Sequence, residues 1–583
     1  MNRLWLVKII LLVLIVPMFV CSLPAKAIPT PEVITGDVNA DKQVTTSDYM
    51  LIKSVISGST TSTSTKNKAD VNLDSRVTTM DYFVVKRIIL GESFNFKKPL
   101  VPLAAQPAIN DPGNRITYTV SGVFTNNMVL QRDKVIRVWG WSNNKGGYIY
   151  GELFGEKRYA QINSSGEWVL EFSPHEYTTT GTTLKIYPKN GTATTFSNIL
   201  IGDVWLVSGQ SNAEYSFKEM AVYFKECYNY IDSTDNIRLF RTNKSDAHNS
   251  SGQLVVSGVQ KDVINRSYKW TTTTKSTVEP FSAVGYSFVK ELSNYTDVPQ
   301  GIVMAAAGGC VLHEFMDPAT GAGFSNAGSV WVNENNSIYK YFIAPFKHMT
   351  MRGILFYQGE SNNTMWSTYA NELQACVAGW RKQFDSSFEF YNIQCTSHSA
   401  LVQAFPGLPA LRASQYDAYN LIGDSYLIST LDVGYRLRPS NEPEEDYAHT
   451  FDKKTIGQRA AHIALAKVYK NPAFKYDYVA CPMPINYTWN STGKTVTIDF
   501  ENVGSGLKAY SGSLIGFSFQ TNSGALVKAS AVVVDKDTVR VTMPNRTDLA
   551  ILCYAYEHSA LLEEANLVNS NNIPAPTFRL GKK

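Results

Sequence analysis

The sequence predicts a multidomain protein in which a small all-α module precedes an α/β domain that β-sandwich modules flank on both sides. Three observations predict this architecture. The chain has 583 residues, more than one hydrophobic core usually holds. A loop motif that begins at Asp37 is repeated from Asp70. Farther along, buried-strand patterns end in glycine-containing turns, and regions of short β-rich runs lie before and after them.

The composition is that of a packed globular protein with no strong charge bias. Hydrophobic residues make up 44% of the chain, charged residues 18%, and the formal net charge is +4. No Lys/Arg-rich run is present, so we expect neither a nucleic-acid nor an anionic-membrane partner. The six cysteines beyond the first 27 residues have no CxxC spacing, and their pairing stays open.

Residues 1–27 have the pattern of a signal peptide. Arg3 precedes an apolar run over 9–20, and an A-x-A cleavage signal follows at 25–27. An uncleaved anchor is the alternative, but Pro17 and the small residues favour cleavage. No later apolar run approaches the ~18 residues that a bilayer span requires. We therefore expect a secreted, extracellular protein without a membrane partner.

The repeated loop has the ligand spacing of a calcium-binding EF-hand. In both copies, oxygen-bearing side chains occupy the first, third, fifth and twelfth positions, and a backbone carbonyl at the seventh completes the shell. The expected ligands are Asp37, Asn39, Asp41, Gln43 and Asp48 in one copy and Asp70, Asn72, Asp74, Arg76 and Asp81 in the other. Apolar residues at helical spacing follow each loop: Tyr49, Ile52 and Ile56, then Tyr82, Val85 and Ile89. We expect two structural Ca²⁺ ions to supply much of the module's folding free energy.

Residues 34–92, with this duplicated loop, resemble a type I dockerin. The resemblance implies an EF-hand-like fold and calcium-dependent binding to the cohesin domain of a cellulosome scaffold. Recognition would lie at the tenth and eleventh loop positions, which are Thr46, Ser47, Thr79 and Met80. The chain departs from the pattern at the sixth loop position, where Lys42 and Ser75 replace the usual glycine.

A proline-containing linker is predicted over 93–114. Over 115–199, short β-rich runs alternate with turn signals, which predicts a β-sandwich domain. Residues 479–583 again alternate apolar and polar positions, for example over 494–500, and predict a C-terminal β module that packs on the domain before it.

The predicted α/β domain, residues 200–478, begins with a buried strand that runs into Ser211. The apolar run over 201–207 enters Ser-Gly-Gln-Ser and then helix-compatible residues. This places Ser211 at the carboxyl end of a strand and the start of a helix. Open α/β sheets bind their ligands at this edge.

Two further strands end in groups that could stabilise an oxyanion. The run over 302–307 stops at Gly308 and Gly309, and the run over 353–357 stops before Gln-Gly-Glu-Ser-Asn. Acyl transfer needs N–H donors aimed at one point. The candidate donors are the Ser211 amide, Gly308 or Gly309, and Gln358 or Asn362.

A serine hydroxyl needs a base to become a strong nucleophile, and His449 is the candidate. It precedes a predicted helix with Ile456, Ala460, Ile463, Ala464 and Val468 on its apolar face. Asp446, three residues before His449, would fix the imidazole tautomer.

Over about residues 115–580 the chain resembles sialate O-acetylesterases and plant cell-wall acetyl esterases, which are SGNH hydrolases. The resemblance rests on GQSN at 209–212, QGESN at 358–362 and DxxH at 446–449, supported by MVLQR at 128–132 and LRASQ at 411–415. It implies a flavodoxin-like α/β fold with Ser211 as nucleophile, an Asp446–His449 pair and no catalytic cofactor. The substrate would be an acetylated polysaccharide.

The sequence leaves three alternatives open. The dockerin resemblance favours acetylated xylan or another hemicellulose as the substrate, and O-acetylated sialic acid on host glycans is the alternative. A second alternative is a non-catalytic carbohydrate-binding component with a relic site. A third is a glycoside hydrolase that uses Glu360 and Glu214 as paired carboxylates.

Overall fold

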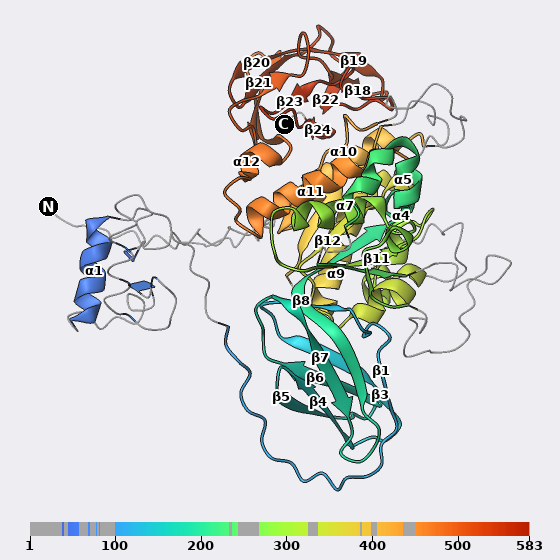
Figure 1. Cartoon of the computed structure of the whole chain (residues 1–583). Coiled ribbons are helices and arrows are strands. Elements are labelled where there is room, and N and C mark those ends of the chain that lie inside the picture. The colour runs from blue at the N-terminus through green and yellow to red at the C-terminus, as the bar shows by residue number, and fades with distance from the viewer. Residues whose placement is uncertain are drawn as a thin grey trace, which may run out of the picture. The chain divides into compact units, whose positions relative to one another are not determined.

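The computed structural model divides the chain into two compact units, Met1–Pro99 and Leu100–Lys583 (Figure 1). The residues that the structure describes are 38–39, 45–57, 68–69, 71, 77, 81, 85, 100–232, 236–242, 268–324, 336–384, 387–397, 405–434 and 449–581.

In the smaller unit, helix α1 (Thr46–Ile56) follows the first repeated loop. Thr45 is its N-cap and forms a capping box with Asp48. Both isoleucines of the predicted apolar helical face lie in α1, but Ile52 is fully buried whereas Ile56 is 39% exposed. Ile56 lies on the same helical stripe but in the last turn, beyond the end of the small core. That core contains Val38, Ile52, Ala69, Val71 and Val85.

The larger unit begins with a strap, residues 100–113, that lies against the following β-strands. The Leu103 amide donates to Ser173 Oγ at 3.0 Å, and the Arg158 guanidinium donates to the carbonyls of Leu103 (3.1 Å) and Ala104 (2.7 Å). Tyr150 also donates its hydroxyl proton to Asp111 at 2.6 Å. The sequence assigned these residues to the linker, because prolines do not reveal that the backbone between them is hydrogen-bonded.

The strap leads into two sheets that form the predicted β-sandwich. The first contains β1 (Tyr118–Val120), β3 (Ile136–Ser142) and β6 (Glu167–Phe172). The second contains β2 (Val129–Gln131), β4 (Tyr148–Leu153), β5 (Glu156–Gln161), β7 (Thr178–Tyr187) and the first part of β8 (Thr194–Gly209). Alternate residues of β4 are buried, which is the pattern of a strand with one face toward a core.

Strand β8 continues from the sandwich into the parallel sheet of the α/β domain. Its first part pairs with β7 and β2, and its last part pairs in parallel with β11 (Gln300–Ala306) and β12 (Gly353–Tyr357). The domain boundary predicted between residues 199 and 200 therefore falls inside one continuous strand. Figure 1 shows β8 running from the sandwich to the centre of the α/β domain.

The parallel strands are arranged in the order β9-β11-β8-β12-β13-β14, with the short β10 antiparallel at one edge. The remaining bounds are β9 (Ile237–Arg241), β10 (Thr271–Thr272), β13 (Glu389–Ile393) and β14 (Ser425–Ile428). The α/β prediction is confirmed. Counted along the chain, the five strands β11-β8-β12-β13-β14 have the flavodoxin order 2-1-3-4-5, and β9 and β10 extend the sheet beyond β11. Alternation of strands and helices in a sequence does not determine which strands become neighbours.

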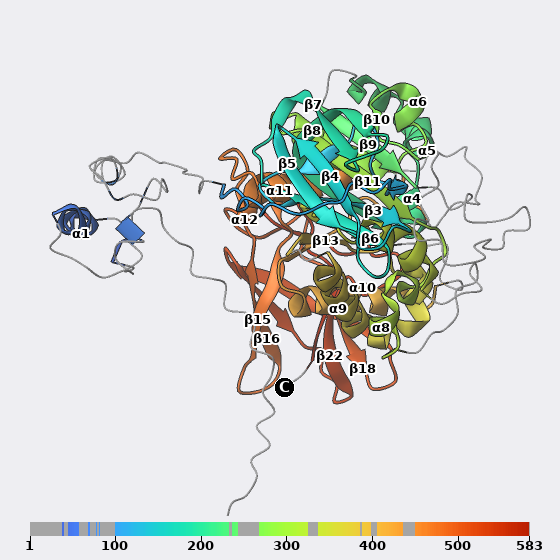
Figure 2. The same cartoon turned by 90° about the horizontal axis from the view of Figure 1, so that it is seen from below.

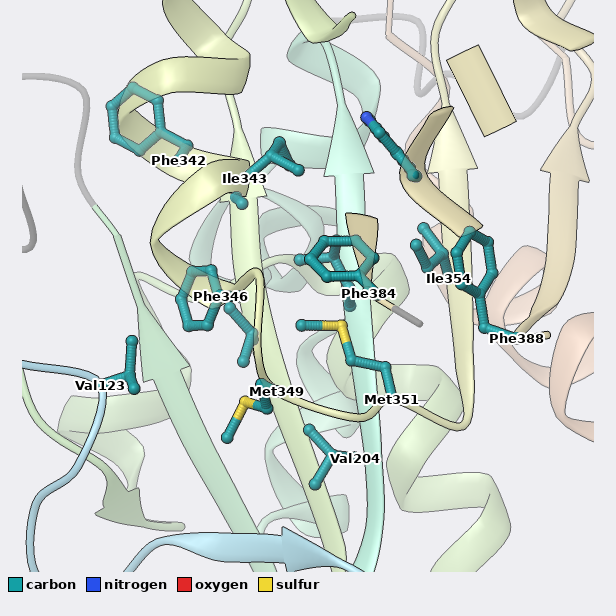
Figure 3. Close-up of a cluster of buried hydrophobic side chains, with 14 of the residues drawn as sticks. Val123, Val204, Phe342, Ile343, Phe346, Met349, Met351, Ile354, Phe384 and Phe388 are labelled. Carbon is teal, nitrogen blue, oxygen red and sulfur yellow. The ribbon is translucent and has the colours of Figure 1, made fainter. Parts of the chain in front are cut away.

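Helices cover both faces of this sheet. Trp205 and Val207 of β8 pack with α5 (Phe217–Tyr223), α7 (Ala283–Ser293) and α11 (Lys453–Lys467). Val204 and Leu206 face the opposite core with α9 (Trp366–Gln383) and α10 (Leu408–Leu421). Figure 3 shows Val204 in this second core. The shorter helices are α4 (Ser211–Glu214), α6 (Lys275–Val278), α8 (Pro318–Gly321) and α12 (Tyr476–Val479).

Two further findings concern disulfide bonds and membrane-spanning helices. The six cysteines beyond the first 27 residues are all buried and free of disulfide bonds. Among the helices within the described ranges, none is both long and apolar enough to cross a bilayer.

The C-terminal module contains two four-stranded antiparallel sheets and packs on the α/β domain, as predicted (Figure 2). Its strands are β15 (Met483–Trp489), β16 (Thr495–Glu501), β21 (Thr538–Thr542) and β20 (Ser530–Asp535), then β19 (Leu526–Lys528), β18 (Phe517–Thr521), β22 (Leu549–Tyr554) and β24 (Phe578–Gly581), and the pair β17 (Lys508–Ala509) and β23 (Leu567–Val568). Arg412 of α10 is buried and joins the module by donating to Thr577 Oγ1 and the Ala555 carbonyl, both at 3.1 Å.

Asp203, in the middle of β8, is a buried hub between separate parts of the larger unit. Its carboxylate accepts hydrogen bonds from Arg132 after β2, Arg352 before β12 and the Tyr469 hydroxyl after α11, at 2.8 to 3.1 Å. Burial alone would raise the pKa of Asp203, but the two guanidinium groups outweigh it and hold the pKa at about 2.

We expect Asp203→Asn to lower the free energy of unfolding by about 3–5 kcal/mol, because Arg132 and Arg352 lose their shared counter-charge. The pKa is depressed in the folded state, so this stabilisation is fully present above the ordinary value of 3.8 and is lost as the pH falls toward about 2. The difference from wild type should therefore stay constant from pH 7 to about 4 and shrink below that.

Urea unfolding followed by tryptophan fluorescence measures this difference, since every tryptophan beyond the first 27 residues lies after residue 100. Asp548→Asn is the matched control, because Asp548 pairs with Arg546 at the exposed surface. An equal effect of both substitutions would contradict the role of Asp203.

Candidate functional site

The nucleophile candidate Ser211 is presented by a tight turn at the end of β8. Gly209 has φ 128°, and a Cβ atom there would lie 2.1 Å from the Tyr357 carbonyl oxygen, so only glycine fits. The Gln210 amide then donates to that carbonyl at 3.0 Å, and α4 begins at Ser211. The predicted strand-to-helix position of Ser211 is confirmed.

Side chains tie this turn to the QGESN segment that follows β12. Gln210 is almost fully buried, and its Oε1 accepts hydrogen bonds from the Gly359 amide at 3.3 Å and the Ser361 amide at 3.2 Å. Asn212, fully buried, donates from Nδ2 to Glu360 Oε1 at 2.6 Å. The two sequence motifs therefore form one polar cluster at the carboxyl edge of the sheet.

Ser211 and His449 line the same open cleft, which has a volume of about 640 Å³. The Tyr215 ring lies against the imidazole, with ring centroids 5.7 Å apart. The cleft is lined by Ser211, Glu214, Tyr215, Ser216, Lys218, Glu219, Arg241, Glu279, Pro280 and His449. Folding thus brings together two predicted catalytic residues that are far apart in the sequence.

The predicted partner of His449, Asp446, lies outside the described residues, as does the whole polar segment 435–448. Asp432 is the last described acidic residue before this segment, and its carboxylate is engaged by the Arg459 guanidinium, with an Nη1–Oδ1 distance of 2.7 Å. Asp446 stays a prediction from the sequence.

The structure distinguishes the two glycines after β11. A Cβ atom at Gly308 would lie 3.2 Å from Ser211 Cβ, so this glycine leaves room for the nucleophile. Its amide donates to Glu214 Oε2 at 2.8 Å. Gly309 has φ 76° and ends the strand in a turn.

The structure also distinguishes Gln358 from Asn362. Gln358 is fully buried, and its Nε2 donates to the Cys310 carbonyl at 3.1 Å and to Asn362 Oδ1 at 2.7 Å. Asn362 Oδ1 also accepts from the Leu312 amide at 2.8 Å, which fixes the orientation of the side-chain amide. Within the described part of the chain, Asn362 Nδ2 has no hydrogen-bond acceptor. Gln358 therefore supports the site, and Asn362 keeps a donor.

The carboxylates of the cleft are engaged by the protein itself. Glu214 accepts from Gly308, Glu219 accepts from Ser216 in a capping box, and Glu279 accepts from the Tyr228 hydroxyl at 2.9 Å. Glu360 lies behind the cleft, 2% exposed and bonded to Asn212. This arrangement disfavours Glu214 and Glu360 as opposed carboxylates for glycoside cleavage.

The sequence analysis missed two cations, Arg241 and Lys453. Arg241 ends β9 at the same sheet edge and lines the cleft, and it makes no ion pair with any described residue. Lys453 is fully buried at the first position of α11. A cation is unfavourable at a helix N-terminus, and this local misfit was a usable signal in the sequence.

The repeated loops of the smaller unit close in the same way. Asp48 Oδ1 accepts from the Val38 amide at 2.7 Å, and Asp81 Oδ1 accepts from the Val71 amide at 2.8 Å, which is the equivalent contact. Both aspartates are fully buried. Buried carboxylates at the twelfth position, with amide and carboxylate oxygens at the others, form a donor set that fits a hard cation.

Most of the other predicted residues of these loops lie outside the described ranges. This holds for Asp37, Asp41, Gln43, Asp70, Asn72, Asp74 and Arg76, and for the recognition candidates Thr79 and Met80. Thr46 and Ser47 are exposed at the start of α1, where a partner could reach them.

Comparison with protein families confirms both resemblances, each in its own segment. Residues 35–90 match the dockerin type I domain. Residues 201–400 match the family described as carbohydrate esterase, sialic acid-specific acetylesterase. The second match contains Ser211 and the QGESN segment and ends before His449.

Comparisons with individual proteins agree with the match to the esterase family. Sialate O-acetylesterases from Pongo abelii and Homo sapiens are each 24% identical over 303 residues, which is 48% of this chain and 56% of theirs. The chain thus spans just over half the length of these curated relatives. A crystal structure of a carbohydrate acetylesterase from Xanthomonas citri superposes with a TM-score of 0.65 at 23% identity, covering 80% of this chain and 99% of that one. This likeness shows the shared fold.

Proposed function

We propose that the chain is a secreted carbohydrate esterase that removes O-acetyl groups from a polysaccharide. The observation that carries the proposal is the meeting of Ser211 and His449 in one cleft at the carboxyl edge of the sheet. The family match of residues 201–400 supports the same reaction class. The signal-peptide pattern of residues 1–27 supports secretion.

In the proposed reaction, His449 removes the proton of Ser211 as Oγ attacks the acetyl carbonyl carbon. The C=O electron pair moves to oxygen and forms a tetrahedral intermediate. When this collapses, the bond to the sugar oxygen breaks, and the imidazolium of His449 donates its proton to that oxygen. Asp446 would hold the His449 tautomer through this step.

The intermediate's oxyanion would be stabilised by the Ser211 backbone amide and Asn362 Nδ2. Asn362 is favoured over Gln358 because its oxygen is held inward by two donors while its nitrogen stays available. The Gly308 amide is the third candidate, but in this structure it donates to Glu214 Oε2, so the Glu214 carboxylate would have to release it first. A single donor of this kind is typically worth about 3–4 kcal/mol.

The second half of the reaction regenerates the enzyme. A water molecule loses a proton to His449 and attacks the acetyl carbonyl of the acyl-enzyme. Collapse of the new tetrahedral intermediate releases acetate, and the imidazolium returns the proton to Ser211 Oγ. None of these steps requires a catalytic cofactor.

We expect Ser211→Ala to reduce acetate release from the true substrate by about 10⁴-fold or more, because the acyl-enzyme cannot form. The assay compares acetylated xylan with O-acetylated sialic acid. Tryptophan fluorescence of the variant serves as the control for folding. Release from neither substrate by the wild type would favour the relic-site alternative, and equal release by both proteins would refute the role of Ser211.

The substrate we favour is an acetylated hemicellulose such as xylan, because a dockerin would bring the esterase to cell-wall-degrading partners. A second candidate is a glycan that carries a carboxylate, such as O-acetylated sialic acid. Arg241 favours this second candidate. Its guanidinium lines the cleft while the glutamates there already accept hydrogen bonds from the protein, and guanidinium binds carboxylate strongly.

Arg241→Gln distinguishes the two candidates. If Arg241 binds a substrate carboxylate, the substitution should lower kcat/KM by about 10- to 100-fold for O-acetylated sialic acid and leave it unchanged for neutral acetylated xylooligosaccharides. Lys225→Gln, at an exposed lysine outside the cleft, is the charge-matched control. An equal loss on both substrates would exclude carboxylate recognition by this residue.

We further propose that the N-terminal unit binds two Ca²⁺ ions and a cohesin domain, which would place the enzyme in a cellulosome. The dockerin match and the equivalent burial of Asp48 and Asp81 support this proposal. The exposed Thr46 and Ser47, with Thr79 and Met80 of the second copy, would contact the cohesin.

In a calorimetric titration of the full chain, we expect two equivalents of Ca²⁺ to bind and chelation to abolish cohesin binding. Asp48→Asn should bind one equivalent less, because a buried ligand of the first loop loses its charge. Ser47→Ala should keep both metal sites. Binding of two equivalents by Asp48→Asn would show that Asp48 is not a ligand.

A further inference from the structure

The polar groups behind the catalytic cleft form one buried hydrogen-bonded network that includes Lys453. Its Nζ donates to Asn212 Oδ1 at 2.7 Å and to the Thr450 backbone carbonyl. Asn212 in turn donates from Nδ2 to Glu360 Oε1 at 2.6 Å. Lys453 and Asn212 are fully buried and Glu360 is 2% exposed, so water does not screen these contacts.

This hydrogen-bonded network joins the three segments that contain the site residues. Asn212 directly follows Ser211, Glu360 belongs to the segment of the oxyanion candidates, and Thr450 directly follows His449. A second contact holds Thr450 in place, because its hydroxyl donates to the Val433 carbonyl. One ammonium group therefore ties the backbone next to His449 to the side chain of Asn212, the residue after Ser211.

Physical chemistry explains why a lysine suits this position. The ammonium has three donors and no acceptor, so it can hold two carbonyl oxygens at once. It also lies over the rings of Tyr215 (4.8 Å) and Tyr357 (5.4 Å), which stabilise a buried cation. The Glu360 carboxylate at the far end of the Asn212 amide supplies the opposite charge, and this charge pattern fixes the amide orientation.

We infer that Lys453 is a positioning residue that sets the geometry between His449 and Ser211. It is not a catalytic residue, since it is fully buried and does not line the cleft that contains Ser211 and His449. Tyr215 is the second link, because one side of its ring contacts Lys453 and the ring also packs against the His449 imidazole. The inference rests on the proposed esterase function.

Lys453→Met tests this inference, since methionine keeps much of the side-chain length but cannot hold the Thr450 carbonyl. We expect kcat for 4-nitrophenyl acetate to fall on the order of 100-fold while KM stays within about threefold, because a misplaced base slows chemistry more than binding. The rate at which a fluorophosphonate probe labels Ser211 should fall in parallel. Lys454→Met is the matched control, because this neighbouring lysine contacts the Tyr230 hydroxyl and takes no part in the hydrogen-bonded network of Lys453.

The double variant Lys453→Met, Glu360→Gln separates positioning from charge compensation. Removing both buried charges should restore much of the thermal stability that the single variant loses, because no unpaired charge remains. The rates of turnover and labelling should stay low, because the Thr450 carbonyl is still not held. If the double variant regains the rate together with the stability, Lys453 only balances a charge and the inference is wrong.

Two other results would also overturn the inference: a normal rate for Lys453→Met, or failure of both variants to fold, which would make Lys453 a folding residue. Failure of the proposed function gives a different result. In that case wild-type Ser211 would react with the probe no faster than it does in denatured protein, whatever residue occupies position 453.

Discussion

Strand β8 is the constraint on which the rest of the larger unit depends. One uninterrupted run of residues is an edge partner of the sandwich at its start and the central strand of the parallel sheet at its end. The register of a strand determines the face of the sheet to which each side chain points. A register shift of one residue in the sandwich would therefore move every side chain of β8 to the opposite face of the sheet. Asp203 fixes the register at the midpoint, where its bonds to Arg132 and Arg352 are satisfied in one alignment only.

The site owes its form to the same strand. β8 delivers Ser211, while its neighbours β11 and β12 deliver Gly308 and the QGESN segment to the same edge. Side chains of the turn residues then join these segments, with Gln210 accepting backbone amides and Asn212 bridging Glu360 and Lys453. A cleft open to solvent is thus backed by a buried polar cluster in which each group restricts its neighbour.

The sequence predicted the types of secondary-structure elements better than their arrangement in space. The predicted strands before Ser211 and Gln358 and the helix after His449 are present, because apolar periodicity and turn residues are local signals. The additional edge strands β9 and β10 were not predicted, and the strap over 100–113 was taken for linker, because both depend on contacts between distant residues. The choice between Gln358 and Asn362 needed the hydrogen bonds of Leu312 and Cys310. Arg241 and Lys453 belong to no motif, so the fold was needed to place Arg241 in the cleft and Lys453 in the buried network behind it.

The strap has a mechanical consequence. A pull on the N-terminal unit enters the larger unit at Leu100, where it meets hydrogen bonds to Ser173 and Arg158 on the sandwich. These bonds lie on the sandwich and not on the parallel sheet, so the sandwich bears the tension before it can reach the catalytic edge. The sandwich would then isolate the geometry of the catalytic site from a force that is applied to the N-terminal unit.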